Sequence, residues 1–259
     1  MGGTTSILYH LGPMPETVTI RSVEQFIPQV REDTAGWPYV WFRGEPGYDP
    51  PLLPRLYRSR ERGGGQDENQ LLQLFRMKAP ILGAEYCPDR EATDQWLFLA
   101  QHVGLPTRLL DWTESALAGL YFALWKPEPD LIPAVWMLDP LKLNQLSVGN
   151  ASFPLTWVPN IESENINAAW TLDQGRVDLP VAILPTNIHP RMSVQRSCFT
   201  VHGRVKDSLA KLIPEILRRY DLDLEQRESM LMDLRKLGIS HSTLFPDLEG
   251  LAKELTGLC

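Results

Sequence analysis

QHVGLPTRLLDWTESALAGLYFAL, residues 101–124, is the stretch that decides the fold, because a dense polar cluster runs directly into the most apolar helix that the sequence predicts. Residues 116–125 have almost no polar face, and a helix that is apolar on every side is buried in the core. The N-terminal end of a buried helix is buried too, so the polar groups before it must pair with one another, with backbone amides or with a ligand. Residues 101–115 therefore form a structural knot, a binding site, or both.

Around this stretch the chain alternates between strand-like and helix-like segments. Runs rich in aromatic and β-branched residues predict strands at 38–44, 132–138, 181–184 and 193–202. Helical periodicity appears at 22–30, 67–79, 93–103, 208–217, 224–237 and 244–255. These segments predict one α+β domain with a mixed, mostly antiparallel sheet and a central buried helix surrounded by other helices. We expect residues 1–20 to be an N-terminal lead and residues 21–259 to be the domain.

Several boundaries follow from individual residues. Pro28 should end or bend its helix early and Pro80 should end its helix, because proline lacks the N–H that a helix interior needs. Three consecutive glycines predict a disordered loop at 59–66. Residues 105–112 read as a loop, and residues 140–178 as a long connection poor in helix.

Helix caps and helix faces can also be predicted. Asp67 and Asp247 should be the N-caps of their helices, and Asp111 with Glu114, or else Thr113, should cap the buried helix. We expect two helices to turn apolar stripes toward the core. The stripes are Leu71, Leu74 and Phe75 in the first helix and Leu248, Leu251, Ala252 and Leu255 in the second.

The composition limits the classes of partner. The 259 residues carry a formal net charge of −7, which argues against non-specific nucleic-acid binding, since that needs lysines and arginines spread along one face. Three widely spaced cysteines without a CxxC pair suit a reducing compartment, and the five histidines show no metal-ligand spacing, so we expect no metal. No apolar run approaches the ~20 residues that span a bilayer. The expectation is a soluble, cytoplasmic protein without a membrane partner.

Arginines gather in the polar segments of this acidic chain. Arg43 ends a strand that looks buried, where it either clamps a phosphate or carboxylate through its planar fork or forms a buried ion pair with Asp111. Arg108 lies three residues before Asp111, and mutual pairing is the default interpretation. Together with Arg55 and Arg58, these arginines form a local positive charge that suits a small anionic ligand such as a nucleotide.

Five segments resemble the FRG domain family, which is named after a phenylalanine-arginine-glycine motif. They are WFRGEP at 41–46, LLPRLYR at 52–58, LAQHVGLPTRLLDWTESALAGLYFA at 99–123, QRSCFTVHG at 195–203 and LGISHSTLFPDLEGLAKEL at 237–255. The resemblance names a motif rather than a reaction.

A more distant similarity, to ADP-ribosyltransferase-like domains, implies a function. Their NAD site begins with an aromatic residue, Arg or His, and often Gly on a first strand, as in 42–44 here, and continues with a Ser, Thr or Tyr segment that leads into a helix, as in 111–115 and Tyr121. It ends with Gln or Glu two residues before a glutamate; Gln195 is similar, but Ser197 stands where that glutamate is expected. In these transferases the glutamate holds the nicotinamide ribose and supports an oxocarbenium-like transition state, so its loss would weaken both functions.

The resemblance implies a nucleotide-binding domain, with NAD as its substrate, that transfers ADP-ribose or cleaves the nicotinamide bond. It assigns catalytic roles to Arg43, Asp111 and Gln195. The residues expected to bind the nucleotide are Arg43, Gln101, His102, Thr107, Arg108 and Thr113. The competing hypothesis is a module that binds or senses an anionic small molecule without chemistry. A third hypothesis, a structural scaffold, requires Arg43, Arg108, Asp111 and Gln195 to pair with one another in a closed core.

Overall fold

The computed structural model describes residues 17–47, 51–58, 67–148, 158, 177–185 and 190–257. The loop predicted at 59–66 and most of the 140–178 connection lie outside the described residues. Among those described, none of the helices has both the length and the hydrophobicity needed to cross a lipid bilayer.

The described strands form one open sheet, in the order β1-β7-β4-β2-β3-β6-β5. Their bounds are β1 Val18–Ile20, β2 Trp41–Glu45, β3 Leu109–Thr113, β4 Ala134–Leu138, β5 Val181–Ile183, β6 Ser197–Val201 and β7 Leu217–Leu222. The β1–β7 pair is parallel and the other pairs are antiparallel. The predicted α+β class with a mixed, mostly antiparallel sheet is confirmed. The lead expected at 1–20 ends with a strand, because β1 extends the sheet beside β7.

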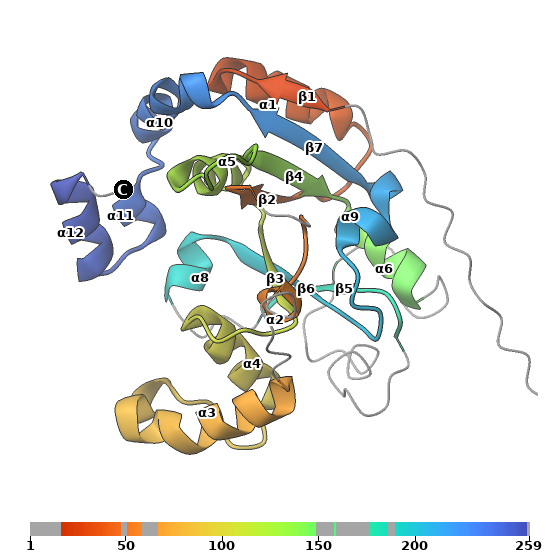
Figure 1. The fold of residues 1–259 in the computed structure, drawn as a ribbon, viewed down its shortest axis with the longest axis vertical. Coiled ribbons are helices and arrows are strands. Elements are labelled where there is room, and N and C mark those ends of the chain that lie inside the picture. Colours follow the sequence, from red (N-terminus) through yellow and green to blue (C-terminus); the bar gives the residue numbers. More distant parts are fainter. Residues whose placement is uncertain are drawn as a thin grey trace, which may run out of the picture.

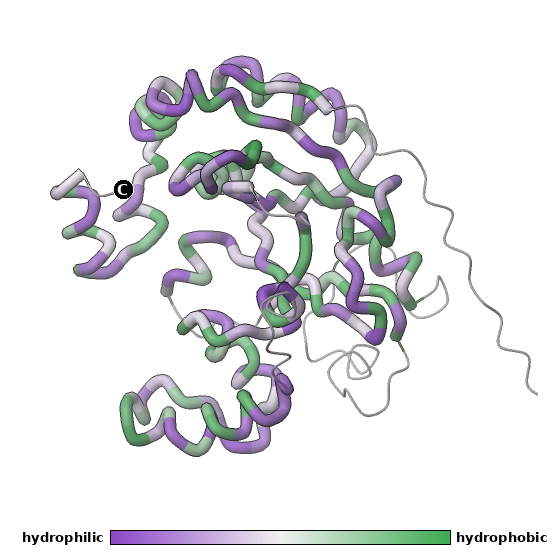
Figure 2. The backbone as a smooth tube through the Cα atoms, viewed as in Figure 1, coloured by the Kyte–Doolittle hydropathy of each residue, from purple (hydrophilic) through white to green (hydrophobic). Residues whose placement is uncertain are grey.

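Helices surround this sheet (Figure 1). Their bounds are α1 Val23–Asp33, α2 Arg55–Arg58, α3 Glu68–Gly83, α4 Thr93–His102, α5 Ala116–Trp125, α6 Pro140–Val148, α8 Pro190–Val194, α9 Leu209–Leu212, α10 Arg227–Lys236, α11 His241–Leu244 and α12 Leu248–Thr256. Short 3-10 helices lie at Ala84–Tyr86, Pro214–Ile216 and Leu224–Gln226. Figure 2 shows hydrophobic residues along the inner strands and hydrophilic residues on the outer turns of α1.

The sheet divides between β2 and β3. β2 pairs with β4 along its whole length, from Trp41↔Leu138 to Glu45↔Ala134. With β3, β2 shares the single register pair Phe42↔Thr113. Beyond that pair the two strands diverge, so that β3, β6 and β5 lie apart from β4 and β7 in Figure 1. The residues that follow Phe42 and those that precede Thr113 therefore face a space between the two halves of the sheet.

α5 is the buried helix expected from the sequence, and it packs against β2 and β4. Six of its ten residues are buried, which agrees with its lack of a polar face. Its N-cap is Ser115, whose Oγ accepts a hydrogen bond from the Ala118 amide at 3.3 Å. The cap predicted at Asp111 with Glu114, or at Thr113, is wrong because β3 continues through Thr113.

Two helices continue beyond their prolines, Pro28, which was expected to end or bend its helix, and Pro80, which was expected to end its helix. α1 runs through Pro28 to Asp33, and α3 runs through Pro80 to Gly83. Each proline removes one helical hydrogen bond, and the turns on both sides hold the helix together. Asp67 is the N-cap of α3 and Asp247 that of α12, as predicted.

The stripe expected to face inward on α12 is exposed, whereas that on α3 is partly buried, because Leu71 packs against α2 and Phe75 against Trp96. Leu74 on α3 is 52% exposed, and Leu248 and Leu255 on α12 are 86% and 77% exposed. Both helices lie at the periphery of the molecule (Figure 1), and the residues that they bury are Glu68 and Gly250. The period of the apolar pattern was correct, but it does not specify which face another element covers.

Several elements were missed, among them β3, α6 and β7. β3 lies where a loop was expected, α6 begins the connection that was expected to be poor in helix, and β7 follows a segment predicted as helix. Asp111 in β3 and the charged residues of LRRYDL in β7 have low strand propensity, so the sequence pattern did not predict these strands. Their outward side chains tolerate charge because the other face supplies the burial.

Candidate functional site

A cleft of about 560 Å³ opens where β2 and β3 diverge. Its walls come from the end of β2, the last turn of α4, β3, α5, the α8–β6 turn and the segment after α11. The residues that line it are Phe42, Arg43, Gly44, Pro46, Phe98, Gln101, His102, Gly104, Asp111, Trp112, Thr113, Phe122, Trp125, Lys126, Glu128, Arg191, Met192, Gln195, Ser197, Phe199 and Phe245. Segments that are far apart in the chain thus meet at one cavity.

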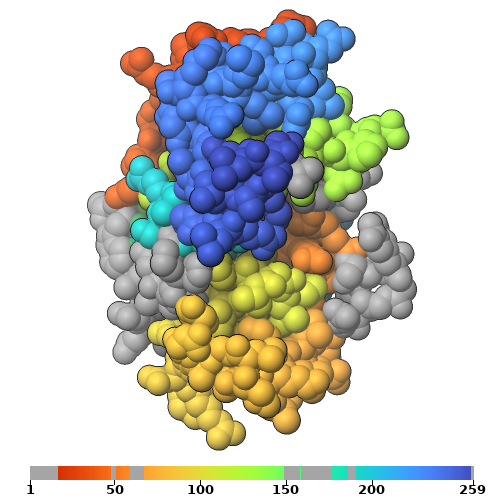
Figure 3. Space-filling model, turned by 90° about the vertical axis from the view of Figure 1, so that its left-hand side faces the viewer, coloured from red at the N-terminus to blue at the C-terminus, as the bar shows by residue number. Residues whose placement is uncertain are grey.

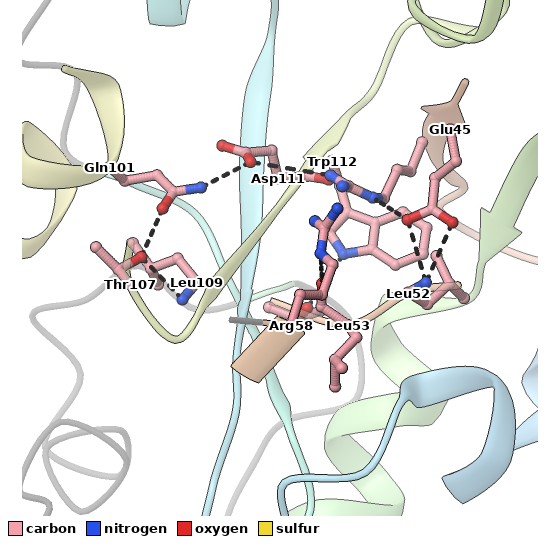
Figure 4. Close-up of polar contacts among 11 residues, drawn as sticks. Glu45, Leu52, Leu53, Arg58, Gln101, Thr107, Leu109, Asp111 and Trp112 are labelled. Carbon is pink, nitrogen blue, oxygen red and sulfur yellow. Dashed lines mark hydrogen bonds and ion pairs between the residues drawn. The ribbon is translucent and has the colours of Figure 1, made fainter. Parts of the chain in front are cut away.

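Arg43 is held at the edge of the cleft by a carboxylate from its own strand. Its Nε donates to Glu45 Oε1 at 2.9 Å, and both Glu45 oxygens accept from the Leu52 amide at 3.1 Å (Figure 4). The Arg43 side chain is 11% exposed and that of Glu45 is 2% exposed. The predicted pairing with Asp111 is the longer contact, at 3.8 Å, although Arg43 Nη1 also donates to the Asp111 carbonyl at 2.7 Å.

The role of Glu45 was missed. Residues i and i+2 of a strand point to the same face. A strand that includes both Arg43 and Glu45 therefore predicts that their side chains can pair. The prediction ended the strand at Gly44, one residue too early. With its guanidinium fixed by Glu45, Arg43 has its orientation set before any ligand arrives.

Asp111 presents a half-exposed carboxylate, with a side chain 55% exposed. A chain of hydrogen bonds positions it: Gln101 Nε2 donates to Asp111 Oδ2 at 2.7 Å, and Thr107 Oγ1 donates to Gln101 Oε1 at 2.5 Å (Figure 4). The Leu109 amide donates to Thr107 Oγ1 at 3.1 Å and completes the chain. Thr107 thus fixes which end of the Gln101 amide faces the carboxylate. Thr107 does not line the cleft itself.

Arg108 is not among the residues that line the cleft, and its side chain pairs with Glu68 rather than with Asp111. Its Nε lies 3.4 Å from Glu68 Oε2, and its amide donates to Glu68 Oε1 at 2.8 Å. Both residues are buried, and burial raises the pKa of Glu68 while the charge of Arg108 opposes that rise. Arg108 therefore anchors the start of α3 to β3.

Thr113 and Gln195 both line the cleft, and they join its two walls. Thr113 Oγ1 donates to the Gln195 carbonyl at 2.7 Å and accepts from the Ser115 amide at 3.0 Å. Gln195 lies in the turn before β6, and its Nε2 donates to the Leu244 carbonyl of α11 at 2.9 Å. His102 lines the cleft from the last turn of α4 and is half-buried.

Of the predicted site residues, the structure brings Arg43, Gln101, His102, Asp111, Thr113 and Gln195 to one cavity and leaves Thr107 and Arg108 outside its lining.

Part of the cleft lining is aromatic, at residues that the sequence had not singled out. Phe245 lies with its ring centroid 4.9 Å from that of Trp125 and 6.1 Å from that of Phe122. The guanidinium of Arg191 lies 4.1 Å above the Phe245 ring. Aromatic rings of this kind suit a planar heterocycle, and the guanidinium of Arg191 covers one face of Phe245.

The C-terminal helices complete this aromatic wall. In Figure 3, α11 and α12 in dark blue lie between α10 above and the yellow helix α4 below. Glu254 of α12 accepts from Ser240 Oγ at 2.8 Å and from the Ser242 amide at 2.7 Å, which ties α12 to the start of α11. Hydrogen bonding by the side chain and amide of Ser242, and by Ser240, lowers the pKa of Glu254 from 4.5 to about 2.

Glu254→Gln is expected to lower the free energy of unfolding by about 1–2 kcal/mol at pH 7, because it removes charge-assisted hydrogen bonds. The pKa of Glu254 is lower in the folded state, so this contribution is full above about pH 4.5 and is lost as the pH falls toward 2. Urea unfolding from pH 7 to pH 2.5 measures the difference between wild type and variant. Glu249→Gln, on the same helix with a side chain 77% exposed, is the matched control. A difference between wild type and Glu254→Gln that stays constant across this range would contradict the assignment.

Part of the chain, which includes residues of the cleft, is similar to a known protein family. Residues 38–130 match the sequence model of the FRG domain. The chain contains an FRG domain. No characterised protein and no solved structure matches the chain.

The FRG domain match runs from just before β2 to just beyond α5, so it includes Arg43, Gln101, Asp111 and the buried helix. Within the motif, Phe42 packs in the core, Arg43 faces the cleft, and Gly44 lies against α5. Gln195 and Phe245 contribute to the cleft from outside the matched residues.

Proposed function

We propose that the cleft of this FRG domain binds NAD, and that the chain transfers ADP-ribose or cleaves the nicotinamide bond. The observation that supports this proposal most is the meeting of Arg43 and Asp111 where β2 and β3 diverge. A guanidinium and a half-exposed carboxylate thereby share one cavity with an aromatic wall. These are the three kinds of group that a dinucleotide with phosphates, ribose and a heterocycle requires.

Each part of NAD has a complementary group in the cleft. Phosphate oxygens suit Arg43, whose fork Glu45 already orients. The nicotinamide ring suits the surface formed by Phe122, Trp125 and Phe245. Asp111 then lies where positive charge develops on the ribose as the bond from C1′ to the nicotinamide nitrogen breaks. The electron pair leaves with nicotinamide, and water or an acceptor nucleophile adds to C1′ after giving its proton to a base such as Asp111.

Ser197 stands where ADP-ribosyltransferase-like domains have a glutamate, so another residue must supply the negative charge. Ser197 lines the cleft and pairs in register with Thr113, while Asp111 pairs with Phe199. Thr113 and Asp111 are two residues apart on β3 and both line the cleft. In this proposal the negative charge expected at Ser197 comes from Asp111 on the neighbouring strand.

The alternative is a module that binds an anionic ligand without chemistry. The observation that favours it is the engagement of the Asp111 carboxylate, which accepts from Gln101 and lies 3.8 Å from Arg43. The scaffold hypothesis has less support, because Arg108 pairs elsewhere and an open cleft lies beside Arg43 and Asp111.

Incubation of the purified chain with NAD tests the proposal, with nicotinamide release and mass addition to protein and nucleic acid as readouts. Asp111→Asn is expected to lower the rate about 100-fold, because it removes the charge that stabilises the transition state. Asp178→Asn is the matched control, since that aspartate also pairs with an arginine, has a side chain 41% exposed, and does not line the cleft. NAD binding without nicotinamide release or mass addition would overturn the enzymatic proposal and favour the module.

A further inference from the structure

A second cavity, of about 400 Å³, adjoins the cleft and has a different character. It shares Arg43, Gln101, Gly104 and Asp111 with the cleft. Its other lining residues are Arg55, Arg58, Leu105, Leu109 and Leu110. Three guanidinium groups therefore surround it, against the single lining carboxylate of Asp111.

α2 is built to present its arginines here. Its two middle residues, Leu56 and Tyr57, are buried and fix the short helix to the core. Arg55 and Arg58 flank them. Their guanidinium groups are positioned by backbone carbonyls: Arg55 Nη1 donates to the Gly104 carbonyl at 3.0 Å, and Arg58 Nε donates to the Leu53 carbonyl at 2.8 Å. Figure 4 shows the Arg58 side chain directed from α2 toward Asp111 and Trp112.

This arrangement favours a ligand with more than one negative charge. Arg43 is compensated by Glu45, whereas the carbonyl that holds Arg55 leaves the positive charge of that residue in place. Guanidinium groups around one cavity repel one another, and a bound anion relieves that repulsion. Their planar forks match the oxygens of phosphate better than a point charge does.

We infer that this second cavity is a diphosphate subsite, which takes the two phosphoryl groups of a nucleoside diphosphate ligand. The anion site stands on its own geometry, while the nucleotide part rests on the proposed function. A nucleotide whose phosphates contact Arg55 and Arg58 passes its ribose over Asp111, because that residue lines both cavities. Its ring then contacts the aromatic residues that line the cleft. The inference therefore gives the direction in which the nucleotide lies, with its phosphates at Arg55 and Arg58 and its ring in the cleft.

Calorimetric titration of the full chain with inorganic pyrophosphate tests the anion site. The wild type is expected to bind saturably, and Arg55→Gln to bind about tenfold more weakly, because one charge-assisted contact is lost. Arg55 is exposed, so this variant is expected to fold, and Arg58→Gln supplies a second variant. Arg196→Gln, whose arginine pairs with Glu114 outside this cavity, should bind within twofold of wild type. Absence of saturable binding at millimolar pyrophosphate, or equal binding by the Arg55→Gln/Arg58→Gln double variant, would overturn the inference.

A second titration, with ADP-ribose, tells whether the diphosphate belongs to a nucleotide. If it does, ADP-ribose binds more tightly than pyrophosphate, and Arg55→Gln weakens both by the same factor. ADP-ribose binding that Arg55→Gln leaves unchanged would overturn the inferred direction of the nucleotide. Pyrophosphate binding that depends on Arg55, in a chain that does not turn over NAD, would instead refute the enzymatic proposal alone.

Discussion

Glu45→Ala is expected to lower the free energy of unfolding by about 3–5 kcal/mol, one of the two largest effects expected in the chain. Glu45 is 1% exposed, and its carboxylate accepts from two donors, the Arg43 guanidinium and the Leu52 amide. Its removal leaves a largely buried cation and a buried amide without their acceptor, and each of these losses is costly. Urea unfolding at pH 7 measures the change.

Two further variants separate this effect from a general loss of charge. Glu228→Ala, at an exposed helix position, should change stability by less than about 0.5 kcal/mol. The double variant Arg43→Met/Glu45→Gln removes the buried charges together and keeps an acceptor for Leu52. It should recover most of the lost stability, yet it should not bind NAD. A cost below about 1 kcal/mol for Glu45→Ala would show that Arg43 finds another partner.

Gly44→Ala is expected to cost about 3 kcal/mol or more, because β2 and α5 touch at this glycine. A Cβ there would lie 2.1 Å from the Gly119 carbonyl oxygen and 2.4 Å from the Ala123 amide nitrogen. Both atoms belong to the helix backbone, so a side-chain rotation cannot make room, and the strand must move away from the helix. Thermal or urea unfolding reports the loss, and the displaced Arg43 should weaken ligand binding as well.

Gly83→Ala is the matched control for this prediction. A Cβ at Gly83 would meet only the Tyr86 side chain, at 3.3 Å, and a glycine that tolerates alanine gains stability through the unfolded chain. The expected change is within about 1 kcal/mol and of either sign. Equal stability of Gly44→Ala and Gly83→Ala would contradict the close packing of β2 on α5.

The fold could be predicted from the sequence wherever one segment carried its own signal. α5 is apolar on every side, so its burial followed from ten residues alone. β3 and β7 could not be predicted in the same way, because Asp111 and Arg218 interrupt the pattern at outward positions. Only the neighbouring strands show that those positions face outward.

The sequence predicted several residues of the candidate site, but it did not predict most of their contacts. Arg43 and Asp111 were chosen because charged groups beside a buried segment need partners, and the structure places them together. Arg108 was chosen by the same reasoning, but its partner could not be predicted, because Glu68 is 40 residues away and looks like an ordinary first-turn glutamate of α3. The aromatic wall depends on how α11 docks against α5, and periodicity carries no information about docking.

The central claim is that the cleft between β2 and β3 holds a nucleotide through Arg43. Calorimetric titration of NAD into the wild type and Arg43→Lys tests it most directly, because lysine keeps the charge beside Glu45 and loses the planar fork. We predict saturable binding by the wild type and at least about tenfold weaker binding by the variant, with the fold of both verified by unfolding. Absence of NAD binding by the folded wild type, or equal affinity of the two proteins, would contradict the claim.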